Sequence, residues 1–122
     1  MKNFNKDIGY FCEQIASDYL LNKNYKILER NYRTHFGEID IVCIFKGTLI
    51  IIEVKGRYNN SFGLPRESVT SNKQKNIIKV CKHYISKHKL YNINVRFDVI
   101  EIFLNHNNTI YHLSHISDAF RL

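Results

Sequence analysis

The chain has 122 residues, which is enough for one domain, residues 1–122, and too few for two independent cores. Hydrophobic residues make up 44% of the chain and charged residues 24%, a composition typical of packed globular proteins that excludes a disordered or collagen-like chain. Eighteen Lys and Arg against eleven Asp and Glu give a net charge of +7, and residues 68–97, which include seven basic and no acidic side chains, supply the whole surplus. This segment favours nucleic acid as a partner, although a solvated basic face has the same composition.

The sequence pattern predicts neither a membrane-spanning segment nor a secretory signal. No apolar run approaches the roughly 20 residues of a membrane-spanning helix, so we expect no membrane segment. Asp7 and Glu13 interrupt the stretch where a secretory signal requires an apolar core, which predicts a cytoplasmic protein. The three cysteines form no CxxC pair, and an odd count suits neither a disulfide framework nor a thiolate zinc site, so buried reduced thiols are expected.

The N-terminal quarter predicts a helix and a short strand. Apolar side chains over residues 8–20 recur at spacings of three and four, which is typical of an amphipathic helix. Asn5 or Asp7 would cap its start, and Asn24 would adopt the left-handed conformation that ends it. Residues 25–29 then predict a short strand.

Two apolar segments predict a β-hairpin in the middle of the sheet. Residues 36–45 and 48–55 are rich in Ile and Val, and Lys46-Gly47 between them suits a two-residue turn. Both segments are apolar at nearly every position, which is typical of a central sheet that helices cover on both faces. A long polar loop, residues 56–67, follows directly after Lys55, and such loops are often functional.

The second half of the chain predicts a helix and two more strands. Ser71 and Gln74 have the spacing of a capping box at the start of a helix. Residues 95–104 and 109–113 predict strands, and residues 117–120 predict a short terminal helix. The helix has a predicted core stripe of Ile77, Val80, Cys81, Tyr84 and Ile85, and an opposite face with Lys75, Lys79, Lys82 and Lys89. The alternation of helices and strands predicts an α/β domain.

Charged residues within the predicted hairpin are the strongest functional signal. Glu53 and Lys55 are two residues apart and share one face of their strand, as do Glu38 and Asp40 on the other strand. Carboxylates in apolar strands are costly unless a cation neutralises them, and two converging carboxylates favour Mg²⁺ or Mn²⁺. Lys55 would then hold a water or a phosphate oxygen, which completes a set suited to phosphodiester hydrolysis. A cross-strand salt bridge of Lys55 is the structural alternative, and the role of Glu38 stays open.

Four segments in order carry a resemblance to a known family. GEIDIV at 37–42, LIIIEVKGR at 49–57, RFDVI at 96–100 and HISDAF at 115–120 resemble the YraN-type uncharacterised protein family over almost the whole chain. That family is similar to the restriction-endonuclease-like nucleases of the PD-(D/E)xK superfamily, including archaeal Holliday-junction resolvases, and its members are described as predicted endonucleases. The resemblance implies a restriction-endonuclease-like α/β fold, with a mixed central β-sheet flanked by helices.

The resemblance also implies a set of site residues. Asp40, Glu53 and Lys55 match the Asp, the Asp/Glu and the Lys of the motif, and Glu13 matches an additional acidic residue of the resolvase-like members. The expected function is therefore an endonuclease in which Asp40, Glu53 and Glu13 hold Mg²⁺ or Mn²⁺ and Lys55 positions or activates the attacking water. Alternatively, Glu13 is a half-exposed side chain bonded to a loop.

The expected partner is nucleic acid, with DNA as the first candidate. Aromatic residues that would stack on unpaired bases, or pack at a domain edge, are Tyr32, Tyr58 and Phe62. Residues expected to contact phosphates are Arg57, Arg66, Lys73, Lys75, Lys79 and Lys82. Lys73 would alternatively extend along the core edge. The competing hypotheses are a non-catalytic nucleic-acid-binding module that acts with partner proteins, and a homodimer that uses residues 56–67 for assembly.

Overall fold

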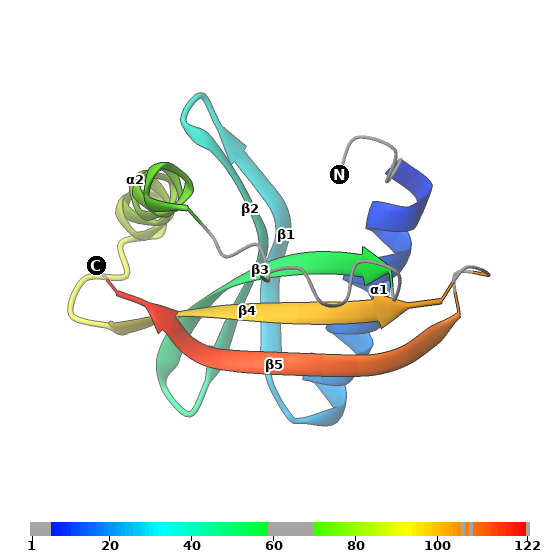
Figure 1. The fold of residues 1–122 in the computed structure, drawn as a ribbon. Coiled ribbons are helices and arrows are strands. Elements are labelled where there is room, and N and C mark those ends of the chain that lie inside the picture. Colours follow the sequence, from blue (N-terminus) through cyan, green and yellow to red (C-terminus); the bar gives the residue numbers. More distant parts are fainter. Residues whose placement is uncertain (1–5, 59–69, 106, 108, 122) are drawn as a thin grey trace.

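A computed structural model describes residues 6–58, 70–105, 107 and 109–121. These residues form two helices and one five-stranded mixed sheet, an α/β architecture (Figure 1). Neither helix has the length and apolarity that crossing a membrane requires. The elements run in the order α1 (Lys6–Asn22), β1 (Lys26–Thr34), β2 (Gly37–Phe45), β3 (Thr48–Tyr58), α2 (Ser71–His88), β4 (Asn94–Leu104) and β5 (Ile110–Phe120).

The sheet follows the chain order β1-β2-β3-β4-β5. Neighbouring strands are antiparallel except β3 and β4, which run parallel. A parallel pair needs a long crossover connection, and α2 lies between these two strands in the sequence. The helices α1 and α2 cover opposite faces of the sheet, as the two separate core clusters and Figure 1 show.

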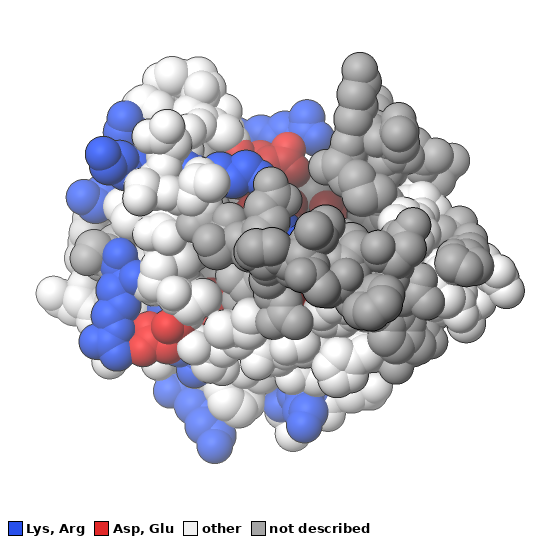
Figure 2. Space-filling view, in the orientation of Figure 1, with Lys and Arg blue, Asp and Glu red and all other residues white. Residues whose placement is uncertain are grey.

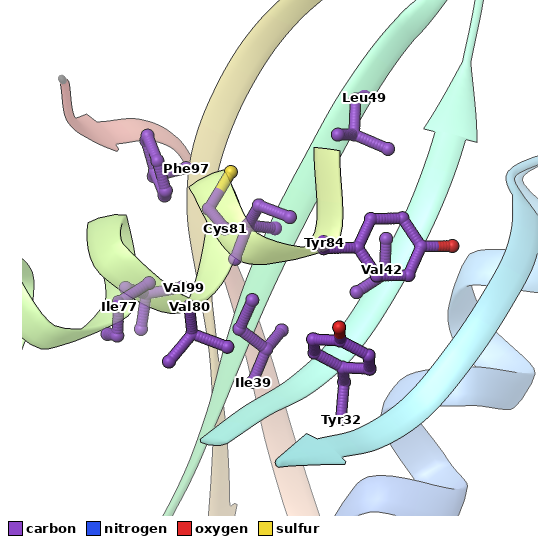
Figure 3. Packing of buried hydrophobic residues seen from close by; sticks show 11 residues of the cluster. Tyr32, Ile39, Val42, Leu49, Ile77, Val80, Cys81, Tyr84, Phe97 and Val99 are labelled. Carbon is purple, nitrogen blue, oxygen red and sulfur yellow. The ribbon is translucent and has the colours of Figure 1, made fainter. Parts of the chain in front are cut away.

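Both faces of the central strand β3 are buried, as the apolar pattern predicted. Leu49 and Ile51 belong to the core on the α2 side, whereas Ile50 and Ile52 belong to the core on the α1 side. Figure 3 shows the first of these cores, where side chains of α2 point toward apolar residues of β2. Burial of each large aliphatic side chain contributes roughly 1.5–3 kcal/mol, so the two cores hold the layers together. The three cysteines are free and buried, as expected.

The turns confirm two local predictions and correct a third. Lys46 and Gly47 have φ values of 50° and 79°, the left-handed pair that a two-residue hairpin turn of this kind requires. Asn24, with φ of 69°, follows α1 in the predicted left-handed conformation. The predicted capping box is wrong by one residue, because Thr70 is the N-cap of α2 and its hydroxyl accepts a hydrogen bond from Lys73 N–H at 3.2 Å. Of the caps predicted for α1, Asn5 lies outside the described residues and Asp7 lies within the helix.

Three strands extend beyond their predicted ends. β1 continues to Thr34 because its second half pairs with the start of β2, and β3 continues to Tyr58 beside β4. The predicted terminal helix over residues 117–120 is wrong, since these residues end β5. Phe120 pairs with Phe97 in the ladder and stacks on its ring at 4.8 Å, a long-range contact that outweighs the short helical pattern.

A buried polar network ties β4 to β5 and to α1. Asp98, which is 0% exposed, accepts hydrogen bonds from Arg96 at 2.8 and 2.9 Å and from Asp118 N–H at 2.9 Å. The His115 ring joins Asp98 at 2.7 Å and Tyr19 of α1 at 2.8 Å. Burial raises the pKa of Asp98, but the hydrogen bonds from His115, Arg96 and Asp118 outweigh it, so its pKa lies below the ordinary value.

Candidate functional site

The ladder between β2 and β3 ends at a pair of carboxylates. Ile41 and Ile52 form the last residue pair of this ladder, and the next residues on each strand are Asp40 and Glu53. Asp40 Oδ2 accepts a hydrogen bond from Val54 N–H at 2.8 Å, and the Asp40 N–H donates to the Glu53 side chain. Each carboxylate therefore bonds to the backbone of the opposite strand, which holds the two side chains together where the strands part.

Four predicted site residues line one pocket beside these carboxylates. Asp40 and Glu53 meet Lys55 of β3 and Lys73 of α2 around a cavity of about 360 Å³. In Figure 2, acidic side chains gather at the upper centre of the molecule, with basic side chains beside them. The remaining pocket residues are Phe36, Gly37, Glu38, Val54, Asn76 and Ile77. Asp40, Glu53, Lys55 and Lys73 thus converge on one pocket.

A third and a fourth carboxylate extend the acidic site toward α1. One carboxylate oxygen each from Glu13, Glu38 and Asp40 lies within 4.8 Å of the others. Burial raises the pKa of Glu13, and a hydrogen bond from the Asn31 side chain opposes the shift. Arg30 lies 4.0 Å from Glu13. Glu38, whose role the sequence left open, belongs to this cluster.

Desolvation raises the pKa values of the two half-buried carboxyl groups. Burial raises the pKa of Asp40 to about 7, with smaller contributions from Glu13 and Glu38. Burial and the neighbouring Asp40 raise the pKa of Glu53 well above its ordinary value. Lys55 lowers the pKa of both carboxyl groups, yet both pKa values stay elevated. The effect of burial on both carboxyl groups therefore outweighs the attraction of Lys55.

The donor set fits a hard divalent cation. Glu53 Oε2 is shielded from solvent and has no hydrogen-bond partner among the described residues. A buried carboxylate oxygen without a partner is costly, and a cation would compensate it. Carboxylate oxygens from Asp40, Glu53 and Glu13 are the ligands that Mg²⁺ and Mn²⁺ prefer.

Some predicted nucleic-acid contacts have other partners in the fold. Arg57 forms an ion pair with Glu101 at 2.9 Å, with side-chain exposures of 17% and 2%, so this bond competes with the predicted phosphate contact. Tyr32 is buried and its hydroxyl bonds to His83 at 2.6 Å, and Tyr58 packs against the α1-side core. Both aromatic residues therefore pack within the fold, and Tyr32 does so in the core on the α2 side and not at the domain edge that the alternative named. Arg66, Phe62 and residues 59–67 of the polar loop lie outside the described residues.

The lysines of α2 form an exposed face, as the helical pattern predicted. Lys75, Lys79 and Lys82 are exposed, and basic side chains lie along the α2 side of the molecule in Figure 2. Lys73 differs from them, because it lines the carboxylate pocket and its charge lowers the pKa of Glu53. Its position favours the predicted orientation toward the cleft.

Phe36 and Asn31 are among the residues of the site that were not predicted. Phe36 lines the pocket from the connection between β1 and β2. Asn31 lies within β1 with φ of 55° and bonds to Glu13. Asn adopts the left-handed region more readily than most residues, which is a weak sequence signal for a special backbone position. Nothing in the local pattern indicates that either residue faces the carboxylates.

Comparison with known proteins identifies similar chains. The model of a family described as "Uncharacterised protein family UPF0102" matches residues 12–102. A UPF0102 protein of Clostridium botulinum strain Eklund 17B is 64% identical over 121 residues, which cover 99% of both chains. A UPF0102 protein of Clostridium beijerinckii is 56% identical over 122 residues, covering 100% of this chain and 99% of the relative. One of Clostridium perfringens strain 13 is 46% identical over 122 residues, covering both chains fully.

Proposed function

The chain belongs to the UPF0102 family, the YraN-type family that its motifs resemble, and from the site geometry we propose that it is a metal-dependent endonuclease. It hydrolyses phosphodiester bonds in nucleic acid, with DNA as the first candidate, on a restriction-endonuclease-like fold. The observation that carries this proposal is the half-buried Asp40–Glu53 pair beside Lys55, at the point where β2 and β3 part. Clustered ionisable groups with strongly shifted pKa values in an open pocket typically mark a reactive site.

The carboxylates would hold the metal. Asp40 and Glu53 would ligate Mg²⁺ or Mn²⁺ with Glu13, and the Val54 carbonyl would be a further ligand. Glu38 belongs to the same acidic cluster, and its ion pair with Arg33 at 3.0 Å offsets part of the negative charge that it would place next to the ion. A bound divalent ion polarises phosphoryl oxygens and stabilises the charge that develops in the transition state.

The lysines of the pocket would act on water and phosphate. The Lys55 ammonium would orient the attacking water, whose oxygen bonds to phosphorus while one P–O ester bond breaks. The proton that the water loses passes to solvent, and the leaving oxygen takes up one proton from solvent, so the step consumes one water. Lys73 lines the same pocket from α2, and it would contact the substrate phosphate. The exposed lysines of α2 would attract the phosphate backbone without sequence preference.

A cleavage assay tests the proposal directly. The purified protein is incubated with labelled single-stranded, duplex, flap and four-way-junction DNA, and with RNA, in the presence of Mg²⁺, Mn²⁺ or chelator. We expect cleavage of at least one substrate with either metal and none with chelator. Binding that weakens with salt but never leads to cleavage would instead support the non-catalytic nucleic-acid-binding module.

Metal binding is expected to depend on pH in a defined direction. The folded-state pKa values of Asp40 and Glu53 are raised, so without metal both groups favour the folded state below their ordinary pKa. Asp40 loses that contribution as pH rises through about 7, and Glu53 loses it as pH rises through its own raised pKa. Protons and Mg²⁺ compete for the same oxygens. A Mg²⁺ concentration near 100 Kd at pH 8 should raise Tm by about 10 °C, and the same concentration should raise it less at pH 6.

Differential scanning calorimetry at both pH values measures this effect. Asp18→Asn, which changes an exposed carboxylate of α1 outside the pocket, is the matched control and should keep the full shift. Asp40→Asn should lose the Tm shift that Mg²⁺ causes. Equal Tm shifts at pH 6 and pH 8 would contradict metal binding by these carboxylates.

A further inference from the structure

Phe36 is an exposed aromatic residue at the carboxylate pocket. Its side chain is 38% exposed and lines the same cavity as Asp40 and Glu53. The connection between β1 and β2 carries it, and its N–H donates a hydrogen bond to Thr34 Oγ1 at 3.1 Å. Phe36 belongs to neither of the two core clusters of the described residues. Its position is therefore not explained by core packing.

The neighbours of the Phe36 ring are suited to a nucleotide. The Lys79 ammonium of α2 lies over the ring, 5.1 Å from its centroid. The ring of His35 lies beside it, with the centroids 4.1 Å apart and the planes at 36°. A ring surface for a base and a cation for a phosphate are thus adjacent, on the rim of the pocket that holds the carboxylates.

We propose that Phe36 and Lys79 bind an unpaired nucleobase and its phosphate next to the bond that is cleaved, which makes the protein selective for unpaired nucleotides. This inference rests on the proposed function and names its substrate class. An exposed cation–π contact is weaker than a base–aromatic stack, so the base displaces the Lys79 ammonium from the ring and the ammonium moves to the phosphate. A base within a duplex is already stacked on both faces, so Phe36 takes up a base only where the strand is unpaired.

Fluorescence binding measurements test the stack without requiring cleavage. Short single-stranded DNA and RNA oligonucleotides carry 2-aminopurine at successive positions, and binding is measured in Ca²⁺ and in chelator. Phe36→Ala should weaken single-strand binding by about 5- to 100-fold and remove the quenching of one 2-aminopurine position. Phe36→Tyr should keep both the wild-type affinity and the quenching. Tyr91→Ala, which removes a 63% exposed aromatic side chain outside the pocket, should change neither.

An abasic nucleotide at the quenched position completes a double-mutant cycle. It should weaken binding to the wild type by the same factor as Phe36→Ala and should not weaken binding to that variant further. Duplex binding should stay unchanged in all variants. If Phe36→Ala binds single strands with wild-type affinity, the proposal is wrong. It is also wrong if the variant loses as much affinity for duplex as for single strands.

Two further outcomes separate this inference from its alternatives. If Phe36→Ala changes the sedimentation mass of the protein without nucleic acid, the ring is a protein–protein contact and the proposal is wrong. If the binding cycle holds while the wild type cleaves nothing with Mg²⁺ or Mn²⁺, the stack stands and the proposed nuclease activity fails. The two failures are therefore distinguishable.

Discussion

Asp40→Asn is expected to slow metal-dependent cleavage by at least about 10²- to 10³-fold and to leave the fold intact. A divalent ion contributes several kcal/mol to the stabilisation of transition-state charge, and each 1.36 kcal/mol is a factor of ten in rate. The amide oxygen of Asn still accepts the hydrogen bond that Val54 N–H donates to Asp40 at 2.8 Å, so the parting of β2 and β3 is preserved. The substitution removes one negative charge and keeps the shape of the side chain.

Single-turnover rates with a cleaved substrate measure the effect, and Asp18→Asn serves as the matched control. Without metal, Asp40→Asn should have a higher Tm than the wild type at pH 8, because the repulsion between Asp40 and Glu53 disappears. Cleavage at the wild-type rate would show that Asp40 is not a ligand. A loss of cleavage together with a lower Tm would mean that the substitution damages the fold instead.

Asp98→Ala should destabilise the folded protein by about 3–5 kcal/mol, since it leaves cationic Arg96 and the ring of His115 without their buried partner. Asp98→Asn should have a smaller effect, because the amide still accepts from Arg96 and from Asp118 N–H. Asp118→Asn is the control: it removes only an exposed ion pair with Arg121 and keeps the backbone N–H, so the unfolding free energy should stay near the wild-type value.

The contribution of Asp98 to the stability of the folded protein should also vanish in acid. Its pKa is lowered in the folded state, so it stabilises the protein above the ordinary Asp pKa of about 3.9 and this stabilisation is lost as pH falls through the folded-state pKa. Urea unfolding at pH 7 and at pH 3 should show a smaller difference between the wild type and Asp98→Asn at the lower pH. A difference that is constant with pH would contradict a charged Asp98 in the folded state.

The local pattern of the chain was sufficient for most of the elements. Periodicity alone predicted both helices, and the run of apolar residues around Lys46-Gly47 predicted the hairpin with its turn and its two buried faces. Asp40, Glu53 and Lys55 were predicted to converge because the register of a hairpin and the two-residue period of a strand are local properties. Their placement in one pocket agrees with that argument.

Other features depend on partners that are distant in the chain. The sequence resemblance alone suggested Glu13 as a site residue, and its approach to Asp40 depends on how α1 packs on the sheet. Arg57 was predicted to contact phosphate, and its competing ion pair with Glu101 exists because β4 lies beside β3. Residues 117–120 follow a helical pattern but end β5, because Phe97 and Asp98 supply a ring stack and a backbone hydrogen bond there.

The family, both helices, the hairpin and the pair of carboxylates could all be predicted from the chain alone. The packing of distant elements places Glu38 in the acidic cluster, buries Tyr32 against α2, and leaves Phe36 exposed at the pocket. Periodicity assigns a residue only to a face of its own helix or strand. Which side chain meets that face, and how much solvent reaches it, depends on the packing of elements that the chain brings together from far apart.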